Sequence, residues 1–177
     1  YTTLFRSVVE PGCGRTACGE EGQGRLADLR EIYLAGLRAL APQDMEGMRV
    51  MVTLGPTREH WDGLRFWTNP STGTMGAAVA VAAWLRGARV EAVCGPGTPW
   101  LPAGIARHNV GSARHMLEAA ASVWPQCDAG VFTAAVADFS PVPPAQGGDK
   151  KFKKSDAPDG FDVHFAPNPD ILKTLAA

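Results

Sequence analysis

From residue 50 onward the sequence alternates short apolar runs with longer segments of helical character, and this alternation constrains the fold more than any other feature. Apolar runs typical of strands occupy residues 50–53, 89–94, 105–110, 130–134 and 161–165. Helical patterns occupy residues 73–86 and 112–123, and a further helix is expected to start with Asn168 as N-cap and Pro169 as its first residue. Such alternation favours a mostly parallel sheet with helices on both faces. We therefore expect an α/β fold with a Rossmann-like, mostly parallel sheet and flanking helices.

The part of the chain before residue 48 follows a different pattern. Residues 8–25 are rich in glycine and poor in apolar side chains, so we expect a loop there. Asp28 and Glu31 open an amphipathic helix that ends before Pro42, and residues 42–47 are expected to be a linker. Residues 1–7 show no period, and we expect them to be an artefact. The predicted units are thus residues 8–41 and 48–177, and both ends are expected to be truncated.

Composition excludes several classes of partner. The 177-residue chain has a formal net charge of −1 with both signs interspersed, so no global positive field would attract nucleic acid or an anionic membrane. We find neither an apolar run long enough to span a bilayer nor a signal peptide, and we expect a cytoplasmic protein whose partners are small molecules. The four cysteines contain no Cys-x-x-Cys pair, which argues against a zinc site or a dithiol redox centre.

Ligands of open parallel sheets bind beyond the carboxyl ends of the strands, so the segments after residues 53, 94 and 134 are the candidates for a site. Residues 54–73 separate the first strand from its helix, unlike the tight glycine turn of a dinucleotide binder. Ser71, Thr72 and Gly73 at the helix start offer hydroxyls and backbone N–H groups that suit a phosphate. Ordinary helix capping explains the same residues equally well.

Two further segments carry polar groups near this expected edge. Small residues over 133–137 would let a flat ligand approach the backbone, and Asp138 could hold a ribose hydroxyl or a magnesium ion. Residues 150–154 contain four lysines that could neutralise a triphosphate. On the residues alone, a turn aspartate and a solvated lysine-rich face remain open as alternatives.

Taken in order, five motifs resemble those of bacterial phosphopantothenate-cysteine ligases. They are residues 53–59 (TLGPTRE), 65–76 (RFWTNPSTGTMG), 134–139 (AAVADF), 151–154 (KFKK) and 168–172 (NPDIL). Residues 17–25 resemble the end of the flavin-dependent phosphopantothenoylcysteine decarboxylase that is fused in front of this ligase in bacteria. The chain therefore looks like a fragment of the bifunctional enzyme of coenzyme A biosynthesis, with the tail of a truncated flavodoxin-like domain ahead of the ligase part.

The resemblance implies a reaction and its small molecules. In the ligase, 4'-phosphopantothenate reacts with CTP and Mg²⁺ to give an acyl-cytidylate, which cysteine then converts to the amide. The decarboxylase uses FMN, whose binding fold would be missing here, and the parent protein would be a homo-oligomer. As a fragment, the chain is expected to be inactive.

The resemblance also implies roles for particular residues. Asn69 would contact the reacting acyl group, Arg65, Ser71 and Gly73 would bind phosphopantothenate, and Lys151 would assist cytidylate formation. Cys18 matches the decarboxylase cysteine that donates a proton after carbon dioxide leaves. Thr74 stands where the family usually has lysine. The residues expected to hold CTP are Thr133, Ala134, Asp138, Lys151, Pro169, Asp170, Ile171 and Leu172, with Asp138 also a candidate metal ligand.

This assignment makes one geometric prediction: Asn69, Asp138 and Lys151 should gather at the same edge of the sheet. Two other functions compete with it. An NAD(P)-dependent reductase of Rossmann type would suit the parallel sheet but lacks the glycine fingerprint. A non-catalytic nucleotide-binding module would use the lysine-rich segment only to bind anions.

Overall fold

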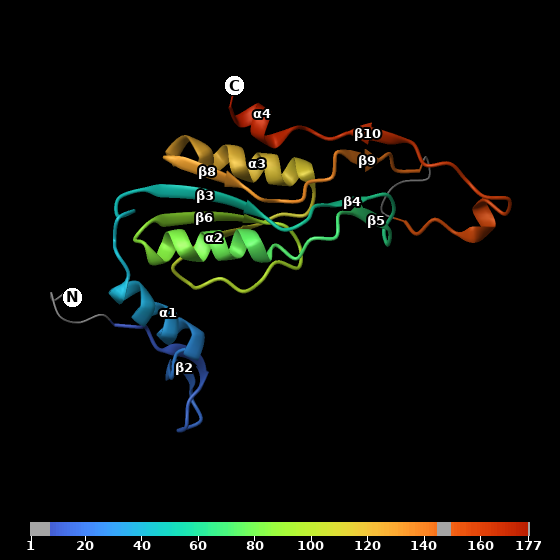
Figure 1. Cartoon of the computed structure of the whole chain (residues 1–177). Coiled ribbons are helices and arrows are strands. Elements are labelled where there is room, and N and C mark those ends of the chain that lie inside the picture. The colour runs from blue at the N-terminus through green and yellow to red at the C-terminus, as the bar shows by residue number, and fades with distance from the viewer. Residues whose placement is uncertain (1–7, 145–149, 177) are drawn as a thin grey trace.

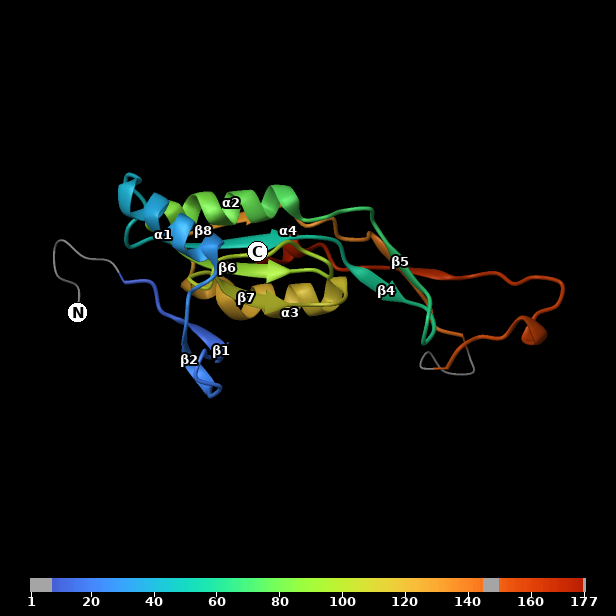
Figure 2. The same ribbon diagram turned by 90° about the horizontal axis from the view of Figure 1, so that it is seen from below.

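A four-stranded parallel sheet forms the centre of the protein. The computed structural model describes residues 8–144 and 150–176, so the expectation for residues 1–7 lies outside the described residues. The strand order is β7-β6-β3-β8, and these strands span Ala106–Asn109, Arg89–Cys94, Arg49–Leu54 and Ala129–Phe132. Helix α2 (Thr74–Leu85) covers one face and helix α3 (Ala113–Val123) covers the other (Figures 1 and 2). The expected α/β fold is confirmed.

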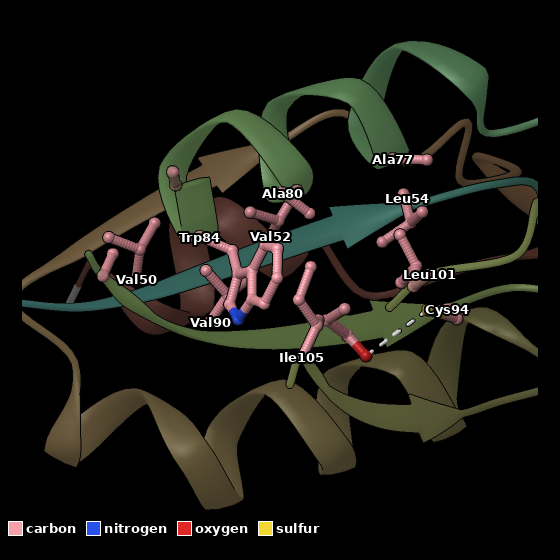
Figure 3. Packing of buried hydrophobic residues seen from close by; sticks show 13 residues of the cluster. Val50, Val52, Leu54, Ala77, Ala80, Trp84, Val90, Cys94, Leu101 and Ile105 are labelled. Carbon is pink, nitrogen blue, oxygen red and sulfur yellow. Dashed lines mark hydrogen bonds between the residues drawn. The ribbon is translucent and has the colours of Figure 1, made fainter. Parts of the chain in front are cut away.

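Strand β3 supplies both halves of the core because its side chains alternate between the two faces of the sheet. Val52 and Leu54 are fully buried under α2, where they pack with Ala80 and Trp84 (Figure 3). Met51 points to the opposite face and belongs to the cluster beneath α3. The apolar run of residues 50–54 is continuous because a central parallel strand is covered on both faces.

Two glycines fix how α2 begins. Gly73 is its N-cap and has φ 70°, a left-handed conformation that side chains disfavour. Gly76 lies one turn further on, where a Cβ would meet Thr133 Oγ1 at 2.3 Å and Leu54 Cβ at 2.5 Å. The helix can approach the end of the sheet this closely only because Gly76 has no side chain.

The N-terminal elements lie to one side of the sheet. Helix α1 (Leu29–Leu40) begins at Asp28, whose side chain accepts a hydrogen bond from Arg30 N at 2.8 Å, as the sequence predicts. The expectation of a loop over residues 8–25 is wrong, since β1 (Gly12–Arg15) and β2 (Glu21–Arg25) form an antiparallel hairpin. Its strands carry too few apolar side chains for the alternation by which strands are recognised.

Two antiparallel strand pairs extend beyond the carboxyl edge of the sheet, and we call them together the arm (Figure 2). One pair is β4 (Arg58–His60) with β5 (Phe66–Thr68), and the other is β9 (Phe139–Pro141) with β10 (Phe165–Pro167). The rings of Trp67 and Phe165 join the pairs, with centroids 4.8 Å apart. The strand expected over residues 161–165 is wrong, because Phe161 stacks on Trp61 instead and the strand starts only at Phe165.

The chain then returns to the sheet through helix α4 (Ile171–Leu175). Its N-cap is Asp170, whose carboxylate accepts from Lys173 N at 2.9 Å, so the expectation of Asn168 as N-cap is wrong. Short 3₁₀ turns occupy Trp124–Gln126 and Lys154–Asp156. In the described part of the chain, no helix combines the length and the apolar character that crossing a membrane requires.

Candidate functional site

Residues 134–138 continue from β8 past the edge of the sheet and form a wall that we call the 134–138 wall. Thr133 N donates to Thr53 O at 3.0 Å and Ala135 N donates to Gly55 O at 2.9 Å, so the pairing of β8 with β3 carries on after both strands end. Ala137 N then donates to the hydroxyl of Thr57 at 3.0 Å. Thr57 is fully buried, and its side chain takes the place of the next carbonyl in the ladder.

Two asparagines also hold this wall. Asn69 Nδ2 lies 3.1 Å from Val136 O and 3.4 Å from Ala135 O. Asn168 donates from its side chain to Ala137 O and from its backbone to Asp138 O, each at 2.8 Å. Side chains from three separate segments therefore fix the backbone of one short stretch.

A cavity of about 290 Å³ lies on one side of the wall, and we call it the strand-end pocket. Its size is close to the lower limit for small-molecule sites. The lining residues are Thr53, Phe132, Ala134, Val136, Ala137, Asp138, Asn168, Pro169, Asp170, Ile171 and Leu172. Six of the residues predicted to hold CTP are among them, drawn from two motifs that are far apart in the sequence.

A second cavity, of about 460 Å³, shares Ala137 and Asp138 with the first, and we call it the aromatic pocket. Its other lining residues are Trp67, Asn69, Phe139 and Phe165. Asn69 and Asp138 therefore meet in one cavity, as the sequence predicted. The three aromatic rings come from β5, β9 and β10 of the arm, and sequence reasoning missed them because strands this short carry no readable period.

A third cavity, of about 320 Å³, surrounds the start of α2, and we call it the helix-start pocket. It is lined by residues 70–76 and Thr133, so Ser71 and Gly73 face it together. Thr133 was predicted to bind the nucleotide, but it lies here, and its hydroxyl donates to Thr53 O at 2.7 Å. No side chain caps α2 at Gly73, and the positive end of the helix dipole at this cavity suits an anion.

Thr74 also lines the helix-start pocket. Its hydroxyl lies 2.7 Å from the hydroxyl of Thr72, and its backbone N–H donates to the same atom at 3.4 Å. The pocket thus offers hydroxyls where the resembling family carries a lysine charge.

Lys151 lines none of these three cavities, so they do not bring it together with Asn69 and Asp138. The reason lies in its neighbour Phe152, whose ring is 5.1 Å from Trp61 and 4.9 Å from Phe161. These contacts hold the lysine-rich segment at the far end of the arm (Figure 1). The antiparallel pairing of β9 with β10 carries it there, and that pairing could not be predicted from the sequence.

Arg65 also lies on the arm and outside the three cavities. Its guanidinium pairs with the buried carboxylate of Asp62 at 2.5 Å and donates to Phe152 O at 3.2 Å. Burial raises the pKa of Asp62, but backbone donation from Leu64, Arg65 and Phe152 and the charge of Arg65 outweigh it and lower the pKa to about 2. Asp62 thereby ties the β4–β5 turn to the lysine-rich segment.

Cys18 lies in the exposed turn between β1 and β2. Its sulfur is 2.9 Å from the hydroxyl of Thr16, and this hydrogen bond lowers the pKa of the thiol. Cys94 is the opposite case, because burial raises its pKa. A thiol that is both accessible and shifted toward the thiolate fits a chemical role better than a packing role.

Acidic and metal-binding groups are sparse around the cavities. Among residues 8–144 and 150–176, no group of three or more His, Cys, Asp and Glu is arranged to hold a metal ion. Asp138 is exposed and would supply a single carboxylate. A magnesium ion here would need its remaining oxygen ligands from bound phosphate and water, which is how proteins commonly hold it.

Comparison with known proteins places this site in a family. Residues 45–177 match the model of the DNA/pantothenate metabolism flavoprotein C-terminal domain. The coenzyme A biosynthesis bifunctional protein CoaBC of Vibrio parahaemolyticus is 38% identical over 97% of this chain and 42% of its own length. The Bacillus subtilis protein of the same name is 42% identical over 94% of this chain and 41% of its own length. The chain thus spans less than half of these relatives.

A solved structure agrees with these relatives. The crystal structure of the C-terminal domain of CoaBC superposes with a TM-score of 0.59 at 38% identity, covering 73% of this chain and 58% of that one. Residues 45–177, which match the family model, include the sheet and the motifs that form the three cavities. The chain therefore belongs to the family of the DNA/pantothenate metabolism flavoprotein C-terminal domain.

Proposed function

We propose that this chain carries the nucleotide-binding part of a CTP-dependent phosphopantothenate-cysteine ligase of coenzyme A biosynthesis. One observation carries the proposal: Ala134 and Asp138 from one motif and residues 169–172 from another, all expected to hold CTP, line one cavity at the carboxyl edge of the parallel sheet. This edge is where sheets of this kind bind nucleotides. The CoaBC names of the relatives agree with the same pathway.

The strand-end pocket would take the cytosine and the ribose. Its small side chains, Ala134 and Ala137, let a flat ring approach the backbone, and Ile171 closes one side with an apolar surface. Asp138 stands where this cavity meets the aromatic pocket, so its carboxylate would hold a ribose hydroxyl or share a magnesium ion with the phosphates.

The phosphates and the acyl substrate would lie on either side of Asn69. The helix-start pocket offers the hydroxyls of Ser71 and Thr72 and the positive end of α2 to a phosphate group. The aromatic pocket, with Asn69 on its wall, would receive the pantothenoyl chain, whose gem-dimethyl group suits the rings of Trp67 and Phe165. Asn69 would then reach the carboxylate of that chain.

The chemistry requires these groups to be brought into line. A carboxylate oxygen of 4'-phosphopantothenate attacks the α-phosphorus of CTP, the bond to the β-phosphate oxygen breaks, and pyrophosphate leaves. The amine of cysteine then attacks the acyl carbon, CMP leaves, and the amine proton is released. Both steps depend on positioning and on neutralising phosphate charge, which a rigid pocket at a helix start can provide.

The implied roles of Lys151 and Arg65 stay predictions. The guanidinium of Arg65 pairs with Asp62 and donates to the backbone of Phe152, the residue that follows Lys151. The proposal for the nucleotide pocket does not depend on either of them.

A second activity is proposed for the β1–β2 hairpin. The lowered pKa and the exposure of Cys18 support a proton-donating role in phosphopantothenoylcysteine decarboxylation, in which FMN supplies the redox chemistry. FMN, Mg²⁺, a homo-oligomeric assembly and a cytoplasmic location stay predictions. No described feature favours the NAD(P)-dependent reductase, since residues 55–73 between β3 and α2 form a long connection that contains β4 and β5, and not a tight glycine turn.

Isothermal titration with CTP, ATP and NADPH tests the proposed function. We expect 1:1 binding of CTP in the presence of Mg²⁺, weaker binding of ATP and none of NADPH. Asp138→Ala should weaken CTP binding, while Asp159→Ala, on the distant segment that follows the lysines, should leave it unchanged. Equal affinity for all three ligands, or no loss in Asp138→Ala, would contradict the assignment.

A further inference from the structure

Glu59 is a buried carboxylate that the proposed mechanism does not use. It lies in β4, and only 4% of its surface is exposed. Its Oε1 accepts from the backbone N–H of Ala113, the first residue of α3, at 2.9 Å. Its Oε2 lies 2.8 Å from the hydroxyl of Ser140 in β9. Burying a carboxylate is costly, so these contacts must be maintained for the fold to tolerate it.

The contacts continue from Ser140 to the wall of the strand-end pocket. The Ser140 hydroxyl is 2.5 Å from Asn168 Oδ1, and Asn168 Nδ2 donates to Ala137 O at 2.8 Å. Asn168 also lines the cavity itself, directly before residues 169–172. A continuous chain of hydrogen bonds therefore runs from the start of α3 through Glu59 and Ser140 to the pocket.

We propose that Glu59 is a positioning residue for the strand-end pocket, acting through Ser140 and Asn168. Neither Glu59 nor Ser140 lines the cavity, whereas Asn168 does and accepts a hydrogen bond from Ser140. Asn168 connects the two motifs that face each other across the pocket, because it bonds to Ala137 and precedes Pro169. Fixing its side chain fixes the width of the pocket. The inference deepens the proposed function and rests on it for the identity of the ligand.

The number of hydrogens available to the bonds between Glu59, Ser140 and Asn168 decides which variants can serve as controls. Ser140 has one hydroxyl hydrogen but two oxygen neighbours, Glu59 Oε2 and Asn168 Oδ1. The Asn168 amide is oriented by its donation to Ala137 O, so its oxygen faces Ser140 as an acceptor and shares the single hydroxyl hydrogen with Glu59 Oε2. A glutamine at position 59 would present its N–H₂ to Ser140 and its carbonyl to Ala113 N, and would satisfy every contact. An alanine would satisfy none of them.

Glu31 offers a matched control. Its carboxylate also accepts a hydrogen bond from a distant backbone N–H, that of Ala103 at 2.8 Å, but it lies on α1, whose residues line none of the three cavities. Glu31→Ala removes the same kind of bond with no path to the strand-end pocket. A general loss of stability would affect both variants.

The experiment combines CTP titration with amide hydrogen exchange on the full chain. Glu59→Ala and Ser140→Ala should weaken CTP binding by about tenfold, the size of one hydrogen-bonded contact to a buried group. They should also speed exchange of the Asn168 and Ala137 amides. Glu59→Gln should keep the affinity within about twofold because it rescues the contacts, and Glu31→Ala should behave like the wild type in both measurements.

Several results would overturn the proposal. Unchanged exchange at Asn168 in Glu59→Ala and Ser140→Ala would show that the chain of bonds does not hold the wall. An equal loss of CTP affinity in Glu59→Gln and Glu59→Ala would show that the hydrogen bonds of Glu59 do not control the pocket. If Glu59→Ala fails to fold, Ser140→Ala and Glu59→Gln decide the question. If the wild type binds no CTP, the proposed function fails, while the exchange data still decide whether Glu59 positions Asn168.

Discussion

The side-chain nitrogen of Asn69 lies 3.1 Å from the carbonyl oxygen of Val136, although 67 residues separate them in the chain. This contact joins the long segment after β3 to the wall that continues β8. It places a polar side chain, a carboxylate and three aromatic rings around one cavity. Removing it should therefore affect both stability and ligand binding.

Asn69→Ala should lower the free energy of unfolding by roughly 0.5–1.5 kcal/mol, the usual net worth of such a hydrogen bond. It should also weaken CTP binding, because the 134–138 wall loses one of the side chains that hold it. Urea unfolding and calorimetric titration measure the two effects. Wild-type affinity in a variant that has lost the expected stability would mean that the wall does not need Asn69 to bind its ligand.

Gly76→Ala should destabilise the protein even though alanine favours helix formation by about 1 kcal/mol over glycine. The added Cβ would lie 2.3 Å from Thr133 Oγ1, so α2 must shift or the hydroxyl must abandon its bond to Thr53 O. Gly36→Ala in α1 is the control, because nothing lies within 4 Å of its Cβ position. We expect a lower melting temperature for the first variant and an equal or higher one for the second. The opposite order would contradict the close packing of α2 on the sheet.

The centre of the parallel sheet could be predicted because β3 and β6 are buried and read as largely apolar runs. The arm could not, since β4 and β5 are each short and the side chains of Phe66 and Trp67 are partly exposed. The β1–β2 hairpin was missed because its glycine-rich strands pair through backbone hydrogen bonds, which leave no pattern of apolar side chains in the sequence. Long-range pairing, such as that of β9 with β10, is not encoded in any local period.

Some residues of the candidate site could likewise be predicted from the sequence, and others could not. Asp138 could be predicted as a pocket residue because it follows a strand signal at the expected edge, and residues 169–172 because their motif resembles that of the ligases. Asn168 was assigned to a helix cap because an asparagine before a proline fits that role in sequence, whereas its side chain bonds to Ala137 and Ser140. The place of the segment that carries Lys151 could not be predicted because its anchor is Phe152, an aromatic residue whose partner Trp61 is remote in the chain.

Asp62 should make the arm sensitive to acid. Its pKa is lowered to about 2 in the folded protein, below the ordinary value near 4, so its contribution to stability is present above about pH 4 and is lost as the pH falls toward 2. Asp62→Asn should lower the urea midpoint at pH 7 and reduce the loss of stability between pH 4 and 2. Asp44→Asn, which breaks an exposed ion pair with Arg86, should change the midpoint little. Equal effects of the two substitutions would contradict a special role for the Asp62 contacts.

Cys18 should be the most reactive thiol of the described chain near neutral pH. The hydrogen bond from Thr16 lowers its pKa, so a larger fraction is thiolate at any given pH below that of an ordinary thiol. Iodoacetamide labelling followed by mass spectrometry should modify Cys18 well before the buried Cys94. Thr16→Val should slow the labelling of Cys18 and leave the exposed Cys13 unaffected, and an unchanged rate would remove the hydrogen bond as the cause.

We propose that a cytidine nucleotide binds between the 134–138 wall and residues 169–172. The most direct test is to follow the backbone amide resonances of the chain by NMR during titration with CTP and Mg²⁺. We expect the largest shifts at residues 133–138 and 168–172 and at the start of α2, with α1 and the β1–β2 hairpin unchanged. Shifts confined to the lysine-rich residues 150–154, or none at all at saturating CTP, would contradict it.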